Sequence, residues 1–304
     1  MLDVSIIIVN YNTKDLLKNC ISSIINNTKT VTYEIIVSDN GSTDGSLEML
    51  RTSFPGVIII DNKKNLGFGA ANNKAKEISQ GKYIFYLNSD TILQNDALYY
   101  FKSYFENNLD KKIGCLGCNL LNENNEIGFS YFKFINYKDE FKNLLKTNIL
   151  LIISSMYRLF HKKKQFVIKN LGTEYFGVVD CVLGADMFMQ NNELTRFDEL
   201  FFMYHEEADL QYNLFIHQDL HSYIIPGPKI VHIGGGSSKC QCDFIDYMLK
   251  ITTYYNVVSK IKYLRKNDNK KIKIFWVKLL SSIVFLNPYI LRNHNRKIKD
   301  LWKI

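Results

Sequence analysis

Residues 4–12 read VSIIIVNYN, and this stretch decides the fold class. A continuous apolar run rich in β-branched residues is typical of a strand that is buried on both faces, as in the interior of a parallel sheet. The polar residues 10–12 end that strand. Asn12 or Thr13 can then cap a helix over 14–26, whose apolar residues recur at helical spacing. The chain therefore opens with a buried strand followed by an amphipathic helix.

The same alternation continues as far as residue 121. Further strands are predicted from Tyr33 to the polar stretch 39–46, at 57–62, from Lys82 to the polar stretch 88–90, and at 113–121. Helices are predicted from Ser46, over 68–79 and over 96–108. This alternation predicts an α/β fold, with an open, mostly parallel sheet and helices on both faces. A basic, aromatic and apolar insertion at 129–168 interrupts the pattern.

Polar side chains follow three of the predicted strands at the points where they end: Asn10-Tyr11-Asn12, Asp39-Asn40-Gly41-Ser42 and Asn88-Ser89-Asp90. In open α/β sheets, ligands bind beyond the C-terminal ends of the strands. Asp39 could accept a hydrogen bond from a base or a sugar, or it could cap a turn. Asp90 suits Mg²⁺ or Mn²⁺ held together with substrate phosphates. His232, which follows an apolar strand, is either a second metal ligand or a structural histidine.

The stretch MYHEEADL at 203–210 places Glu206, Glu207 and Asp209 within four residues of one another. Adjacent carboxylates after an aromatic stretch are unfavourable unless they are paired, protonated or used in chemistry. One of them could serve as a general base. The alternative is a solvated helix start, because acids are favoured in the first turn of a helix.

The charge is unevenly placed along the chain. The formal net charge is +8, and residues 250–304 hold 14 Lys/Arg against 2 Asp/Glu, a local +12 that leaves −4 for residues 1–249. A basic tail on a mildly acidic body favours docking on an anionic surface and disfavours a nucleic-acid-binding body. Two stretches, 148–160 and 274–291, are apolar but interrupted and flanked by lysine. They are too short and too polar to span a membrane and suit interfacial or core helices better.

The cysteines form a CxxC at Cys115 and Cys118 and a CxC at Cys240 and Cys242. Four thiols can hold zinc, but the first pair lies in an apolar predicted strand, where cysteine is a small hydrophobe. The N-terminus has no signal-peptide pattern, so we expect reduced thiols and a cytoplasmic location.

The ordered motifs resemble glycosyltransferase family 2, in the branch of bacterial rhamnosyltransferases. They are SIIIVNYN at 5–12, DNGSTDGS at 39–46, NLGFGAANNKA at 65–75, LNSDT at 87–91, GADMFMQ at 184–190, FDELFFMYHEEADL at 197–210 and HIGGGSS at 232–238. The resemblance covers about residues 4–240. It implies the GT-A fold, a nucleotide-sugar donor and Mg²⁺ or Mn²⁺. It also implies a glycan or lipid-linked acceptor in cell-surface polysaccharide synthesis.

The resemblance also implies roles for individual residues. Those expected to bind the nucleotide-sugar are Val9, Asn10, Tyr11, Asn12, Asp39, Asn65, Gly67, Phe68, Asn72, Asn88, Ser89 and Asp90. Asp90 and His232 would hold the metal, with Asn88 standing where the family often has its first aspartate. Gly184, Ala185 and Asp186 would face the acceptor. Glu207 would be the catalytic base, with Glu206 as the alternative.

The resemblance further implies an inverting single displacement, with dTDP-rhamnose as the preferred donor and UDP-hexose or UDP-N-acetylhexosamine as the alternatives. Residues 1–240 would form the GT-A domain, with a nucleotide-sugar half at about 1–120 and an acceptor half at about 121–240. Residues 241–304 would form a basic, amphipathic helical tail that holds the protein peripherally at the cytoplasmic face of the inner membrane. Other classes are a non-catalytic sugar-nucleotide-binding module, a nucleic-acid binder and a nucleotidyltransferase. The loop NYNTKD at 10–15 lacks the glycines that nucleotidyltransferases and dinucleotide-binding enzymes need at this position, which disfavours both.

Overall fold

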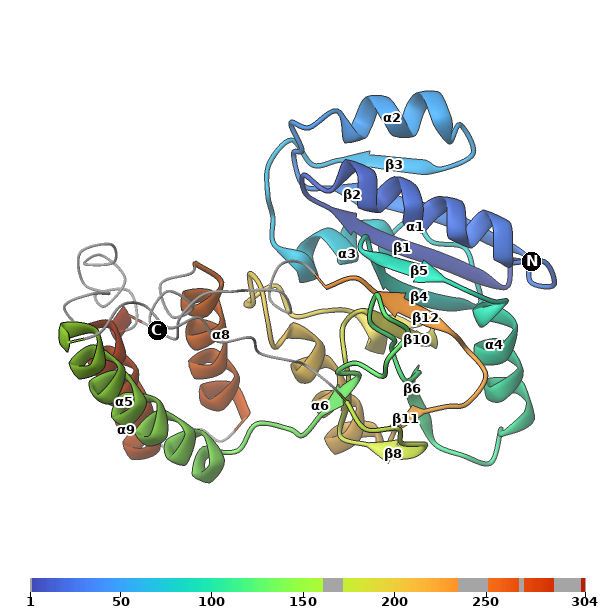
Figure 1. The fold of residues 1–304 in the computed structure, drawn as a ribbon. Helices are drawn as coiled ribbons and strands as arrows, with labels where there is room; N and C mark the ends of the chain where they lie inside the picture. Colours follow the sequence, from blue (N-terminus) through green and yellow to red (C-terminus); the bar gives the residue numbers. More distant parts are fainter. Residues whose placement is uncertain (1, 161–171, 235–250, 268–270, 287–301, 304) are drawn as a thin grey trace. The chain divides into compact units, whose positions relative to one another are not determined.

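The computed structural model describes residues 2–160, 172–234, 251–267, 271–286 and 302–303 (Figure 1). They fall into two compact units. The first holds Met1–Phe134, Asn170–Phe202 and Glu206–Gly235, and the second holds Ile135–Lys169, Met203–His205 and Gly236–Ile304. Residues 135–160, which belong to the predicted insertion, thus fall in the same unit as the described C-terminal helices. The two units describe which segments pack together. They do not test the predicted domain boundary at residue 240, which stays a prediction.

The first unit is built on an eight-stranded sheet with the strand order β3-β2-β1-β4-β10-β6-β11-β8. The strands are β1 (Val4–Asn10), β2 (Tyr33–Asp39), β3 (Ile58–Asp61), β4 (Tyr83–Asn88), β6 (Ile113–Gly117), β8 (Gly177–Val179), β10 (Asp186–Gln190) and β11 (His221–Ile224). The first four in the chain are mutually parallel, as predicted. Strand β10 runs antiparallel to β4 and β6, and β8 runs antiparallel to β11.

Helices cover both faces of this sheet. They are α1 (Lys14–Asn27), α2 (Ser46–Ser53), α3 (Phe68–Lys76), α4 (Ala97–Asn107) and α6 (Glu206–Gln218). Ile6 and Ile8 of β1 lie in a core with apolar residues of α1, α2 and α4. Ile7, on the other face, lies in a core with residues of α3 and α6. The continuous apolar run of β1 is therefore needed because both faces of the strand are buried.

Shorter elements complete the first unit. Strand β5 (Thr91–Leu93) pairs with β12 (Ile230–His232), and β7 (Tyr131–Phe132) pairs with β9 (Cys181–Val182). A short 3₁₀ helix, η1, covers Glu193–Thr195. The β5–β12 pair brings a late part of the chain next to the end of β4.

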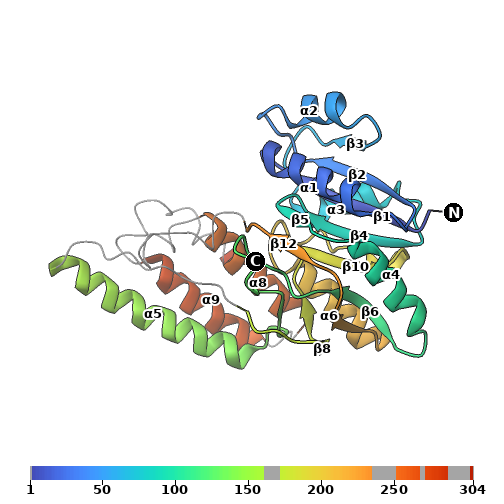
Figure 2. The ribbon, with the colours of Figure 1, turned by 45° about the vertical axis from the view of Figure 1, so that its right-hand side comes forward.

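The second unit contains α5 (Tyr137–Phe160), α8 (Ile251–Asn267) and α9 (Lys271–Leu286). Helices α5 and α9 lie side by side in both Figures 1 and 2. Their shared core includes Leu144 and Leu151 of α5 and Val277 and Leu280 of α9. Both lysine-flanked apolar stretches are thus helical where the structure describes them, and residues 287–291 lie outside the described part. Within that part, no helix is long and apolar enough to cross a membrane.

The cysteine interpretation also has a structural outcome. Cys115 and Cys118 are fully buried free thiols, and burial raises their pKa well above the usual value. They behave as small core residues, as the sequence favoured. Cys240 and Cys242 lie outside the described residues. In the described ranges, no three His, Cys, Asp or Glu side chains gather as a metal site.

Candidate active site

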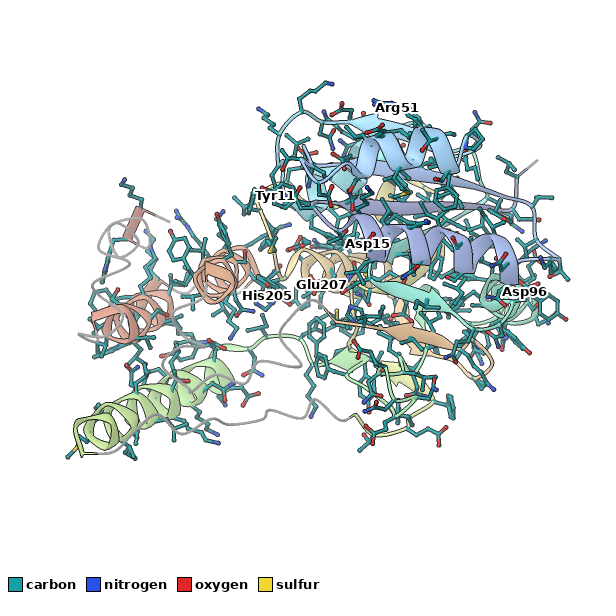
Figure 3. All side chains as sticks on the ribbon, turned by 45° about the horizontal axis from the view of Figure 1, so that its top comes forward. Tyr11, Asp15, Arg51, Asp96, His205 and Glu207 are labelled. Carbon is teal, nitrogen blue, oxygen red and sulfur yellow. The ribbon has the colours of Figure 1, made fainter. Side chains whose placement is uncertain are left out.

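The three polar strand ends lie next to one another at one edge of the sheet. The parallel register pairs Asn10 of β1 with Asp39 of β2, and Val9 of β1 with Asn88 of β4. In Figure 3, Tyr11 and Glu207 both lie toward the end of the sheet that is away from Asp96. The predicted convergence of these strand ends is therefore present in the fold.

Asp39 shapes the loop that follows β2. Its Oδ1 accepts hydrogen bonds from the backbone N–H groups of Gly41 and Ser42, at 3.0 and 2.8 Å, and its Oδ2 accepts one from Nδ2 of Asn10 at 2.7 Å. Asp39 is fully buried. This is the turn-organising role that the sequence left open as an alternative, and the contact with a nucleoside stays a prediction.

The loop after β1 is tied to its neighbours on both sides. The side chain of Asn12 accepts from the N–H of Thr43 at 2.8 Å, and Asn12 adopts a left-handed backbone with φ of 54°. The hydroxyls of Thr13 and Ser89 lie 2.9 Å apart. Thr13 precedes α1 but does not cap it through its side chain; Asp44 instead accepts from the N–H of Lys14 at 2.8 Å. The Tyr11 side chain is 49% exposed at this edge.

Asn65 and Gly67 lie in the tight loop that enters α3. Oδ1 of Asn65 accepts from the N–H of Gly67 at 2.9 Å, and Nδ2 of Asn40 donates to the carbonyl of Gly67 at 3.1 Å. Gly67 has φ of 92°, and a Cβ atom there would lie 2.3 Å from the carbonyl oxygen of Phe202. That same carbonyl accepts from the N–H of Phe68 at 2.9 Å. Only glycine therefore fits this close approach.

Helix α3 contributes one predicted residue whose position differs from expectation. Asn72 was expected to line the sugar side of the donor, but it is only 1% exposed and its Nδ2 donates to the carbonyl of Phe68 one turn earlier. Its neighbour Asn73 was not among the predicted site residues. The Asn73 side chain donates to the Phe197 carbonyl and accepts from the Phe197 N–H, both at 2.9 Å. It thereby fixes α3 against the segment that leads to α6.

Asp90 and His232 are brought together by the β5–β12 pair. His232 lies opposite Thr91, and the N–H of Ile233 donates to the Asp90 carbonyl at 2.9 Å. Nε2 of His232 lies 3.3 Å from Oδ1 of Asp90, and both side chains are partly exposed, at 20% and 14%. The sequence placed these two residues as possible partners, and the fold does bring them into contact.

A divalent cation suits this pair of donors. A carboxylate with an imidazole accommodates Mn²⁺, and Mg²⁺ typically takes one or two protein ligands with the remainder from phosphates and water. Among the described residues, no third His, Cys, Asp or Glu gathers with these two. Asn88 stands two residues before Asp90. Its backbone N–H donates to the Ala185 carbonyl at 3.1 Å.

The three carboxylates at 206–209 occupy the first turn of α6, the position that the helix-start alternative predicts, but they are not all solvated as that alternative requires. Glu206 and Asp209 are buried, at 3% and 1% exposure, whereas Glu207 is partly exposed. Tyr204 and His205, immediately before the helix, have left-handed backbones with φ of 70° and 67°. Of the two candidate bases, Glu207 is therefore the one with a side chain open to solvent.

Gln211, which was not among the predicted site residues, anchors this helix to β9. Its Oε1 accepts from the N–H of Val182 and from the hydroxyl of Ser222, both at 2.8 Å, and its Nε2 donates to the Val182 carbonyl at 2.9 Å. The same Nε2 donates to the carbonyl of Glu207 at 3.2 Å. Only its i, i+4 spacing from Glu207 could have pointed to this role.

The predicted acceptor-facing residues need correction. Ala185 and Asp186 are both fully buried, so their side chains do not face an acceptor. Oδ2 of Asp186 accepts from the N–H of Cys118 at 2.8 Å, and burial raises the pKa of Asp186 well above its usual value. Of these three residues, only Gly184 is partly exposed. A Cβ atom built on it would lie 3.6 Å from Cβ and Cγ of Glu207.

The chain is similar in sequence to known glycosyltransferases. The profile described as "Glycosyl transferase family 2" matches residues 5–164. A poly(ribitol-phosphate) beta-glucosyltransferase from Bacillus spizizenii is 36% identical over 119 residues, which is 37% of this chain and 19% of that protein. An abequosyltransferase from Salmonella typhimurium is 29% identical over 195 residues, 57% of each chain. The matches thus span less than two thirds of either relative.

A solved structure is similar in fold. The mannosyltransferase from Pyrobaculum calidifontis, determined in complex with GDP-Man and Mn²⁺, superposes with a TM-score of 0.54 at 12% identity. The superposition covers 100% of this chain and 77% of that one. At this identity the likeness concerns the fold alone.

Proposed function

This chain belongs to glycosyltransferase family 2 and has the GT-A fold, and on that premise we propose that it transfers a sugar from a nucleotide-sugar to a hydroxyl group of a cell-surface glycan or a lipid-linked saccharide. The observation that carries the proposal is the contact between Asp90 and His232, at 3.3 Å, beside the joined ends of β1, β2 and β4. The names of the two relatives, which include a ribitol-phosphate polymer, support the choice of acceptor class.

The chain's own groups suggest how the donor is bound. The loop after β1, with the exposed ring of Tyr11, and the loop that Asp39 shapes would receive the nucleoside. Exposed aromatic rings are suited to stacking on a base. Asp90 and His232, with Asn88 nearby, would hold Mg²⁺ or Mn²⁺ at the diphosphate. When bound, the cation supplies Lewis-acid stabilisation of the negative charge on the departing diphosphate.

Glu207 would act on the acceptor as a general base. Its carboxylate would take the proton of the attacking hydroxyl while the acceptor oxygen bonds to the anomeric carbon and the bond to the diphosphate oxygen breaks. The nucleoside diphosphate leaves, and attack from the opposite face inverts the anomeric configuration. The exposure of Glu207, compared with the burial of Glu206, supports this assignment.

We prefer dTDP-rhamnose as the donor, because residues 184–190 and 197–210 resemble the rhamnosyltransferase branch. UDP-hexoses and UDP-N-acetylhexosamines are the alternative donors. A glucosyltransferase among the relatives supports a hexose as the transferred sugar. We also propose that the protein works peripherally at the cytoplasmic face of the membrane, with its basic C-terminal region on the anionic leaflet.

The test is a donor screen with the full chain. Thermal unfolding and nucleoside diphosphate release would be measured with dTDP- and UDP-sugars, each with Mn²⁺, with Mg²⁺ and with a chelator. We expect one donor to raise the unfolding temperature and to be turned over only with the cation present. Binding without turnover in the presence of suitable glycan acceptors would instead favour a non-catalytic binding module. That class is disfavoured by the joint presence of Asp90, Glu207 and His232.

A further inference from the structure

Helix α5 carries a large apolar face that is exposed. Its members are Leu145, Ile149, Ile152, Ile153 and Met156, which are 40–59% exposed. Their spacing places them along a single stripe of the helix. Another stripe already serves the core, since Leu144 and Leu151 are buried and Nδ2 of Asn148 donates to the Leu280 carbonyl of α9 at 3.2 Å. The exposed stripe is therefore additional to what packing within the unit requires.

Helix α9 repeats this arrangement with aromatic residues. Ile272, Phe275, Trp276 and Ile283 are 43–77% exposed, whereas Val277 and Val284 are buried. Trp302, itself 43% exposed, lies edge-on to Phe275 with ring centroids 5.8 Å apart. Tryptophan is favoured where an apolar region meets water, as at a membrane interface.

The charges around these faces are almost all positive. In the described parts of the second unit, Lys and Arg number 12 and Asp and Glu number 2, and neither α8 nor α9 contains an acid. One of the two acids, Glu140, is buried against Lys260 at 3.1 Å. On α5, Lys142 and Lys146 are exposed and stand three residues before Leu145 and Ile149, so they lie beside the apolar stripe.

We propose that the exposed apolar faces of α5 and α9 dock on an anionic lipid bilayer, with the helices lying in the interface. Helices of this kind bury their apolar face at the headgroup boundary, and each nearby lysine adds to the attraction for anionic lipid. A second copy of this chain is a poorer partner, because two such cationic surfaces repel one another. This docking rests on the proposed location of the protein at the membrane. Vesicle binding is measured without sugar transfer, so a failure of membrane docking can be distinguished from a failure of the proposed transferase activity.

The test is co-sedimentation of the full chain with phosphatidylcholine vesicles, with and without phosphatidylglycerol. We expect binding only with the anionic lipid, and loss of binding as salt is raised. The double variants Ile149→Ser/Ile153→Ser and Phe275→Ser/Trp276→Ser should each weaken binding about tenfold or more. The control is Leu109→Ser, which removes a side chain that is 84% exposed in the first unit and should leave binding unchanged.

A charge variant covers the case in which the apolar variants do not fold. Lys142→Glu/Lys146→Glu alters only exposed side chains, and it should also weaken binding about tenfold or more while keeping the unfolding temperature. Equal binding by wild type and this variant would overturn the proposal. Light scattering measures the oligomeric state of the same variants. If the apolar variants dissociate an oligomer without changing vesicle binding, the exposed faces of α5 and α9 serve self-association and the proposal is overturned.

Discussion

Nε2 of His232 lies 3.3 Å from Oδ1 of Asp90, and strand pairing between β12 and β5 holds the two together. Neither residue by itself indicates a metal site, because an aspartate after a strand and a histidine before glycines are both common in structural roles. Their contact at the edge where three strands end makes a two-donor site suited to a divalent cation and a diphosphate.

Asp90→Ala should lower kcat/KM by about 100-fold or more, because it removes the only carboxylate of the Asp90–His232 pair and with it the stabilisation of the leaving group. Asn88→Ala should cost about tenfold or less, because an amide oxygen is a weaker ligand for a hard cation. Initial rates measured against Mn²⁺ concentration separate the two. Equal losses would mean that Asn88 shares the metal, and unchanged unfolding temperatures would show that both variants fold.

Glu207→Gln should reduce kcat by about 10²- to 10⁴-fold with little change in KM for the donor, because the amide cannot accept the acceptor proton. The matched variant is Glu206→Gln, at a buried position in the same turn. Donor binding is followed by thermal shift and transfer by product formation. An inactive Glu206→Gln beside a nearly normal Glu207→Gln would reverse the assignment.

Gly67→Ala should destabilise the fold by about 3 kcal/mol or more, because the new Cβ would lie 2.3 Å from the Phe202 carbonyl oxygen at a positive φ. Gly56→Ala is the control, since a Cβ there meets nothing within 4 Å. It should be neutral or slightly stabilising. Urea unfolding midpoints measure both, and comparable midpoints would contradict the close approach.

Asp186→Asn tests the corrected position of that residue. Because burial raises the pKa of Asp186 in the folded state, the folded protein binds more protons than the unfolded chain above the unfolded pKa. The contribution of Asp186 to stability should therefore fall as pH rises from about 4 toward neutrality, by at most about 1.4 kcal/mol per pH unit. The asparagine variant should lack this slope.

Urea unfolding at several pH values gives that comparison. If Asp186 instead contacts the acceptor, the variant would raise the acceptor KM and keep the pH slope of wild type. Leu109→Ser, which removes an exposed side chain and no acid, serves as the control.

The fold was largely predictable because its determinants are local. The β-branched runs and helical spacing between residues 4 and 107 specify strands and helices one at a time, and parallel pairing of the early strands follows from the helices between them. The polar strand ends were likewise visible, since each lies directly after its strand. The sequence could not assign β10 and β8 their antiparallel places, because their partners lie far away along the chain.

What the sequence determined by itself is therefore the α/β class and the identities of the residues at the sheet edge. Tertiary structure alone decided which of them meet and which are covered. It joined His232 to Asp90, buried Asp186 and Asn72, used Asn73 and Gln211 as anchors, and left Glu207 more open than Glu206. The physical reason is that residue type and spacing act within a few residues, whereas contact and burial depend on how distant segments pack.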